Sequence, residues 1–84
     1  MTWTIKFTRP AAKARDRMPP DMRKRILRAL HALAADPYAS PNVKALQGME
    51  GYRLRVGDFR VIYTLDKGLL IIQVIRIANR RDVF

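Results

Sequence analysis

Residues 52–63 read YRLRVGDFRVIY, and this stretch decides the fold class. Large apolar residues alternate with polar ones on both sides of Gly57 and Asp58, which is the period-two pattern of strands that bury one face. A two-residue turn that begins with glycine joins neighbouring antiparallel strands. The stretch therefore predicts a β-hairpin with strands over residues 52–56 and 59–65.

Two further segments extend this hairpin into a sheet. Trp3–Phe7 alternates in the same way, and Leu69–Ala78 is nearly all aliphatic. Near-continuous aliphatic strands are typical of positions covered on both sides, so we expect the second segment to be central and buried on both faces. The turn formers at 66–68 place it next to the hairpin in an antiparallel meander.

Two helices are predicted between the first strand and the hairpin. Thr8 can cap a short helix that ends before Pro19 and Pro20. The segment Met22–Ala35 follows with a continuous apolar stripe. That stripe consists of Met22, Ile26, Leu30 and Leu33.

Residues 36–42 form a turn-rich connector and residues 48–51 form another, and the sheet is expected to resume only at residue 52. The element order is then β, α, α, β, β, β. It predicts an α+β fold in which a helical hairpin packs on one face of a mainly antiparallel, curved sheet, completed by a three-stranded meander. A chain of 84 residues buries only about 60% of its unfolded surface, so we expect a single domain over residues 1–84.

The composition is strongly basic, with 17 Lys and Arg against 7 Asp and Glu and a net charge of +10. Nucleic acid, an anionic lipid surface and an acidic protein are all partners that this charge would attract. The absence of cysteine excludes disulfides and thiolate metal sites. Because there is neither a signal-peptide pattern nor an apolar run of roughly 20 residues, we expect a cytoplasmic protein without a membrane span.

The reactive side chains exclude several classes of reaction. The seven acids stand singly, so their spacing does not suggest a two-metal site. His31 lies on the basic side of the second helix, where a solvated side chain is the ordinary interpretation, and Ser40 fits a turn former. The four glycines match no phosphate-binding spacing.

Arginines on the predicted sheet are the remaining candidates. Arg53 and Arg55 share one face of a strand, Arg60 lies just across the turn, and Arg80 and Arg81 follow the last strand. Like charges that face each other across a hairpin repel, and a bound anion relieves the repulsion. A solvated sheet face remains the alternative, but we favour a site for a polyanion or an acidic partner.

Guanidinium groups suit phosphodiester chemistry, because the planar fork binds phosphate oxygens in pairs and stabilises added charge. RNA supplies its own nucleophile, since the 2′-hydroxyl can attack the neighbouring phosphorus once the backbone is aligned. Arginine stays protonated near neutrality, so it does not serve easily as the general base.

Three motifs carry a family resemblance: KALQGM at residues 44–49, the hairpin at 52–63, and NRRDVF at 79–84. With the element order, they resemble the RelE branch of the RelE/ParE superfamily, the toxins of type II toxin–antitoxin modules. The resemblance implies a toxin that enters the ribosome and cleaves mRNA by 2′-hydroxyl attack, with no metal or cofactor. It also implies a cognate acidic antitoxin as partner, and operator DNA contacted only through that antitoxin.

The resemblance assigns catalytic roles to four arginines. Arg53 and Arg55 match a basic pair that is often lysine in relatives, where it is proposed to include the general base. Arg60 matches the arginine held against the scissile phosphate, and Arg80 matches a second arginine that stabilises the transition state.

The resemblance also assigns RNA binding to Arg81, Asn79 and Phe84. Many relatives have histidine where Asn79 stands, and the terminal aromatic residue is usually tyrosine, whereas Phe84 can stack on a base but has no hydroxyl to donate. Loss of a positioned acid or base costs about 100- to 10,000-fold in rate. The sequence therefore predicts an endoribonuclease, an mRNA interferase of attenuated activity.

Two alternatives keep the fold and change the activity. One is a catalytically weak or inactive module that binds the antitoxin and strengthens operator repression, which the residues at positions 79 and 84 favour. The other is a ParE-like gyrase inhibitor, which the four candidate catalytic arginines disfavour. Cleaved mRNA, intact nucleic acid and broken DNA are the results that distinguish the three.

Overall fold

The computed structural model describes residues 2–79, which form one mixed sheet and two helices. In chain order the elements are β1 (Thr4–Phe7), α1 (Arg9–Arg17), α2 (Pro20–Ala35), β2 (Val43–Ala45), β3 (Tyr52–Val56), β4 (Phe59–Asp66) and β5 (Ile71–Asn79). The strand order is β1-β5-β4-β3-β2, with β1 parallel to β5 and every other neighbouring pair antiparallel. The predicted α+β architecture is confirmed.

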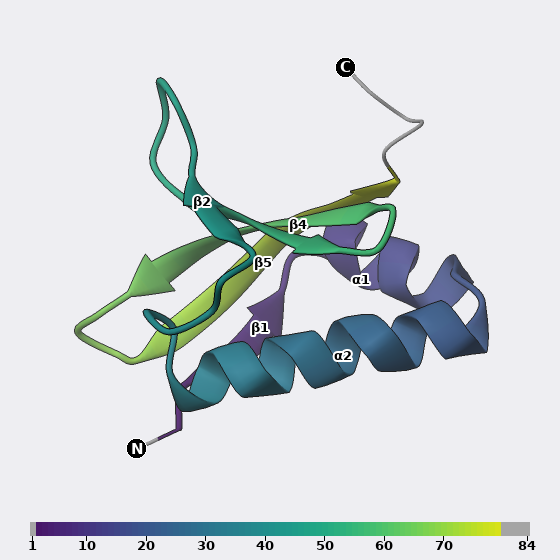
Figure 1. The fold of residues 1–84 in the computed structure, drawn as a ribbon, viewed down its shortest axis with the longest axis horizontal. Coiled ribbons are helices and arrows are strands. Elements are labelled where there is room, and N and C mark those ends of the chain that lie inside the picture. The colour runs from purple at the N-terminus through teal and green to yellow at the C-terminus, as the bar shows by residue number, and fades with distance from the viewer. Residues whose placement is uncertain (1, 80–84) are drawn as a thin grey trace.

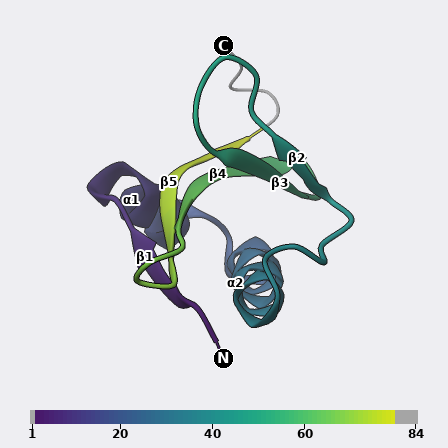
Figure 2. The ribbon, with the colours of Figure 1, turned by 90° about the vertical axis from the view of Figure 1, so that its left-hand side faces the viewer.

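Both helices contribute to one hydrophobic core on one side of the sheet, and α2 runs beneath the sheet in Figure 1. The predicted stripe on α2 is confirmed, because Ile26, Leu30 and Leu33 are buried. Figure 2 shows α2 inside the curve of the sheet. We call the sheet surface turned toward α2 the core face and the opposite surface the open face, which carries no helix of residues 2–79.

Helix boundaries follow from capping. The predicted cap at Thr8 is confirmed, since its Oγ1 accepts a hydrogen bond from the Ala11 amide at 3.4 Å. Its hydroxyl also donates to the Ile75 carbonyl oxygen at 2.7 Å, which fixes the start of α1 to β5. The second helix begins at Pro20, earlier than predicted. Proline is well suited to the first helical position, because a backbone N–H there would have no hydrogen-bond acceptor within the helix.

The predicted three-stranded antiparallel meander is present as β3, β4 and β5, but the segment between α2 and β3 also contains a strand that was not predicted, β2. β2 spans Val43–Ala45 and pairs with Tyr52–Leu54 of β3. The Arg55 amide also donates to the Asn42 carbonyl at 3.0 Å, just before β2 begins. A strand this short holds too few residues to display an alternating pattern, so only pairing with β3 defines it.

The prediction that the last strand is buried on both faces is also wrong. β5 lies between β1 and β4, as expected, but Gln73, Ile75 and Arg76 are exposed. Because the helices cover only the core face, the open side of β5 is uncovered. A central position in this sheet therefore buries only one face of β5.

A β-bulge at Ile75 changes which side chains of β5 face outward. The register steps from Ile62 paired with Arg76 to Tyr63 paired with Val74, which leaves Ile75 as the extra residue. An extra residue reverses the alternation that follows it. Arg76 is thereby placed on the open face, in register with Ile62.

Tyr63 is fully buried on the core face of β4, and its hydroxyl has no hydrogen-bond partner among the described residues. Its ring stacks on Tyr52 with centroids 5.6 Å apart. A buried hydroxyl without a partner costs about 1–3 kcal/mol, while the ring itself fills the core. The hydroxyl is therefore a local weakness in the core.

Replacing Tyr63 with phenylalanine is expected to stabilise the fold by about 1 kcal/mol in urea unfolding at neutral pH, because the variant keeps the ring and removes the hydroxyl. Burial raises the pKa of Tyr63 to about 12, and Tyr52 adds to the rise. An unfolded tyrosine loses its proton near about pH 10, so wild-type stability should fall as pH rises from about 10 to 12. The difference in free energy of unfolding between the variant and wild type should therefore increase from about pH 10 to about pH 12. A constant gap would contradict this interpretation.

No helix within residues 2–79 is both long enough and apolar enough to cross a membrane.

Candidate functional site

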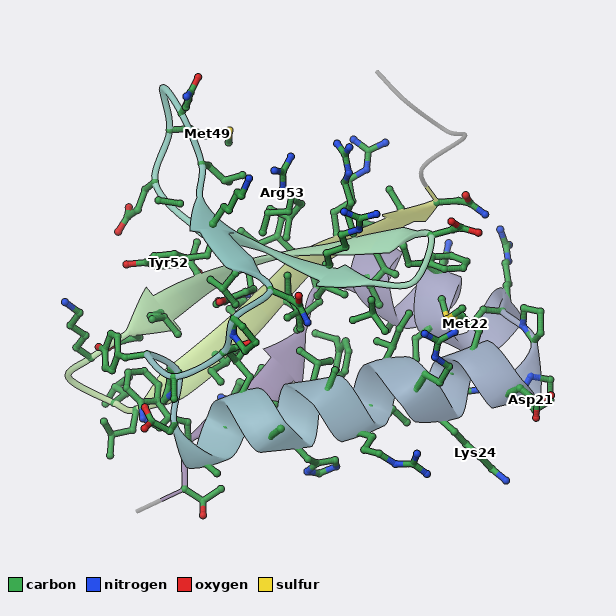
Figure 3. The ribbon with its side chains drawn as sticks, viewed as in Figure 1. Asp21, Met22, Lys24, Met49, Tyr52 and Arg53 are labelled. Atoms are coloured by element: carbon green, nitrogen blue, oxygen red, sulfur yellow. The ribbon has the colours of Figure 1, made fainter. Side chains whose placement is uncertain are left out.

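The strand register assembles basic residues from separate parts of the chain on the open face. Lys44 of β2 is paired with Arg53 of β3, which in turn pairs with Ile62 and then Arg76 across the sheet. In the next row, Arg55 and Arg60 are direct partners across the hairpin. Figure 3 shows Arg53 pointing away from α2. The open face is therefore the basic side of the sheet.

A cavity of about 230 Å³ lies at the end of this face, between the segment that leads into β2 and the β3–β4 turn. It is lined by Pro41, Asn42, Lys44, Arg53, Arg55, Gly57, Asp58, Phe59 and Arg60. Pockets for whole small-molecule ligands span roughly 300–1,000 Å³, so this one suits part of a chain molecule. We call it the basic pocket, since it contains four cationic side chains and one carboxylate.

The β3–β4 turn shapes one wall of the basic pocket. Gly57 has a φ of 58°, a left-handed conformation that glycine adopts without strain. The tight turn folds β4 back on β3, so that Arg55 and Arg60 stand opposite each other. Like charges in this position destabilise a hairpin by a few tenths of a kcal/mol or more, and an anion between them reverses the sign of that interaction.

Helix α2 reaches the same turn from the other side. A Cβ atom at Gly57 would lie 3.3 Å from Nη1 and 3.4 Å from Nη2 of Arg25, and 3.4 Å from the terminal methyl of Met22. The Arg25 guanidinium is thus packed against the wall of the basic pocket. Positive charge continues from the open face around the turn to α2.

Three of the candidate catalytic residues, Arg53, Arg55 and Arg60, lie together in the basic pocket, as the two-residue repeat and the hairpin indicated. Asn79 pairs with Phe59 at the end of β5 and is not among the residues that line the pocket. The other candidates, Arg80, Arg81 and Phe84, lie outside the described residues.

Sequence reasoning missed three polar residues at this surface. Lys44 lies in the unpredicted β2, and Arg76 faces outward only because of the bulge. Asp58 was interpreted only as a turn residue, but its side of the turn lines the pocket. The sequence did contain a signal for Lys44, because it is the single charged residue of the motif at residues 44–49, next to the hairpin.

The arrangement has the chemistry of a phosphate site. Guanidinium groups bind phosphate oxygens through paired, charge-assisted hydrogen bonds. Lys44 and Asp58 add the two groups of the pocket that can give or take a proton, which arginine does not do near neutrality.

An N-terminal strand, two helices on one face and a mixed sheet completed by antiparallel strands are the RelE-like class of fold. The chain belongs to the ParE toxin family of type II toxin–antitoxin systems, whose parDE model matches residues 5–84. The prediction of a RelE/ParE superfamily toxin is confirmed.

Solved structures of similar fold come from bacteria and archaea. A chain of the RelE–RelB complex of Pyrococcus horikoshii OT3 is 27% identical, with a TM-score of 0.82 over 99% of this chain and 100% of that one. A chain of the RelBE2 toxin–antitoxin complex of Mycobacterium tuberculosis is 22% identical, with a TM-score of 0.82 over 95% and 100%. The isolated RelE toxin of E. coli is 19% identical, with a TM-score of 0.79 over 92% and 83%. No curated protein matches the chain by sequence.

Proposed function

We propose that this toxin is a ribosome-dependent mRNA interferase, an endoribonuclease that a cognate acidic antitoxin neutralises. The single observation that supports it best is the basic pocket, which Lys44, Arg53, Arg55 and Arg60 line together with one carboxylate, Asp58. Two of the similar structures above are toxin–antitoxin complexes, which supports the proposed partner.

In the proposed reaction the scissile phosphate sits between Arg55 and Arg60. Their positions across the hairpin allow both guanidinium groups to reach non-bridging oxygens of one phosphate. The pentacovalent transition state carries more negative charge than the phosphodiester, so fixed cations bind it more tightly than the substrate. Arg53 extends the basic row toward β2 and would hold the neighbouring part of the backbone.

Proton transfer is assigned to the two remaining titratable groups of the basic pocket. The Asp58 carboxylate accepts the proton of the 2′-hydroxyl as its oxygen bonds to phosphorus. The bond from phosphorus to the 5′-oxygen breaks, and the Lys44 ammonium donates a proton to that oxygen. The products are a 2′,3′-cyclic phosphate and a 5′-hydroxyl end, with all protons accounted for.

Replacing Lys44 with glutamine is expected to lower mRNA cleavage by about 100-fold, because a positioned proton donor is lost. The Lys44→Arg variant is the sharper test, since arginine keeps the charge but does not donate a proton near neutrality. If Lys44 is the acid, both variants should be equally slow in a single-turnover assay on ribosome-bound mRNA. Full activity of Lys44→Arg would show that only its charge matters.

A second candidate function, gyrase inhibition, is favoured by the match to the parDE toxin model. It requires no cleavage of RNA and uses the same fold. The basic pocket is then a surface for an acidic or DNA-bound partner. The third possibility is the antitoxin-binding corepressor, which cuts nothing.

One experiment distinguishes the three. The purified toxin is added to a cell-free translation reaction, and new mRNA 5′ ends are mapped by primer extension, while plasmid DNA is incubated with gyrase in parallel. We expect cuts within the reading frame that disappear when the antitoxin is added. Intact mRNA with accumulating DNA breaks would establish gyrase inhibition, and no cleavage of either would establish the corepressor.

A further inference from the structure

Helix α2 carries a second basic surface, on the opposite side of the molecule from the open face. Lys24, Arg25, Arg28 and His31 are exposed along it, and we call this surface the basic helix face. In Figure 3, Lys24 points away from the sheet whereas Arg53 points away from α2. Asp21, in the first turn, is the one acidic residue of α2, and no carboxylate follows it along the helix beside Arg28 and His31.

The distribution of these cations does not serve helix stability. Arg23, Lys24 and Arg25 lie close to the N-terminus of α2, where the helix dipole disfavours positive charge, and the last turn contains no basic residue. Lys24 and Arg28 stand four residues apart, a spacing at which like charges repel. Asp21 in the first turn offsets part of these costs, and a bound anion would offset the rest.

The basic helix face also lacks what a protein partner would need. Protein interfaces are centred on apolar and aromatic side chains and are depleted of charge at their core. The exposed large apolar residues of the described chain lie elsewhere, at Tyr38, Met49, Leu69 and Ile75. Nucleic-acid interfaces, in contrast, rely on arginine and lysine against the phosphate backbone.

The two basic surfaces are connected. Arg25 belongs to the basic helix face and packs against Gly57, whose turn forms a wall of the basic pocket, so it links the two surfaces. Lys24, Arg28 and His31 continue from there along one line of the helix, over a rise of about 10 Å. Side chains held in line along one helix suit the regularly spaced phosphates of a double helix, with Lys24 and Arg28 supplying the charge.

We infer that the basic helix face binds the phosphate backbone of double-helical RNA while the basic pocket receives the single strand to be cut. This inference rests on the proposed function only in naming RNA rather than DNA. It assigns α2 to holding the toxin on a structured RNA, and it separates binding from cleavage.

The test measures binding of the purified toxin to a fluorescent RNA duplex, without ribosomes, for wild type and the Lys24→Glu/Arg28→Glu variant. The matched control is Arg9→Glu/Lys13→Glu, an exposed pair with the same spacing on α1 and the same change of net charge. Lys24→Gln/Arg28→Gln repeats the test with a smaller electrostatic change, and circular dichroism verifies that each variant is folded.

We expect the α2 variant to bind the duplex at least about tenfold more weakly, with the slope of log affinity against log salt smaller by about 2. The affinity of the α1 control variant for the duplex should fall much less. Equal losses in both variants, or no binding by wild type, would overturn the inference. So would equal affinity for a DNA duplex, or binding of polyglutamate in place of RNA.

The outcome of the duplex-binding experiment is independent of the outcome of the mRNA cleavage assay. Both α2 variants should still be able to cut, since their changes lie outside the basic pocket. If wild type cuts no mRNA but binds the duplex through α2, the proposed function fails and the RNA-binding surface stands. If mRNA is cut and the α2 variant binds the duplex as wild type does, the inference fails alone.

Discussion

Arg60→Ala is expected to reduce cleavage of ribosome-bound mRNA by about 100- to 1,000-fold while leaving the fold intact. Arg60 lines the basic pocket directly opposite Arg55, so its removal takes away one of the two guanidinium groups that are proposed to bind the phosphate. Because the lost interaction is strongest in the transition state, the single-turnover rate should fall more than the binding of the toxin to ribosomes.

Arg60→Lys and Arg9→Ala are the matched controls. Lysine keeps the charge but loses the planar fork, so Arg60→Lys should show an intermediate loss. Arg9 is an exposed cation of α1 outside the pocket, and its removal should leave cleavage nearly unchanged. If Arg60→Ala cut mRNA at the wild-type rate, the basic pocket would not be the catalytic site. Unfolding experiments on Arg60→Ala would show whether a loss has a structural origin.

The hairpin and α2 could be predicted because their signals are local. Apolar alternation on both sides of Gly57 defines β3 and β4, and the stripe around Ile26 defines α2. The pairing of Arg55 with Arg60 follows from turn length alone. These residues needed no information from distant parts of the chain.

Long-range pairing determined what sequence reasoning missed. β2 exists only because Val43–Ala45 meets β3, and it brings Lys44 beside Arg53. The bulge at Ile75 depends on packing against β4, and it decides that Arg76 faces outward while Asn79 shares a face with Phe59. Neither feature leaves a periodic signal in the sequence.

The family of this chain is established by its similarity to known toxins, whereas its reaction depends on the residues of the site. The parDE model and the RelE structures describe one fold with different activities, and a fold does not fix a function. The difference must therefore lie in surface groups. In this chain the groups that we propose for the reaction are the four cations of the basic pocket, Lys44 among them, and the carboxylate of Asp58.

Gly51→Ala is expected to destabilise the fold by about 3 kcal/mol, the largest effect on stability that we predict. Gly51 has a φ of 125°, which side-chain-bearing residues rarely adopt. A Cβ there would lie 3.0 Å from the Tyr63 carbonyl oxygen and 3.2 Å from Cδ1 of Leu46. The backbone carbonyl belongs to β4 and cannot move away without disturbing the pairing of β3 with β4.

The neighbouring Gly48 provides the control, because it has a φ of 76° and nothing within 4 Å of a Cβ. Gly48→Ala should therefore cost only the backbone strain, about 1 to 2 kcal/mol. For a domain of this size each kcal/mol lowers Tm by roughly 4–8 °C, so thermal unfolding should separate the variants clearly. Equal losses would mean that backbone strain alone, and not the approach of the 46–51 loop to β4, requires glycine at position 51. A larger loss for Gly51→Ala is the result expected from the sum of its less accessible φ and its contact with β4.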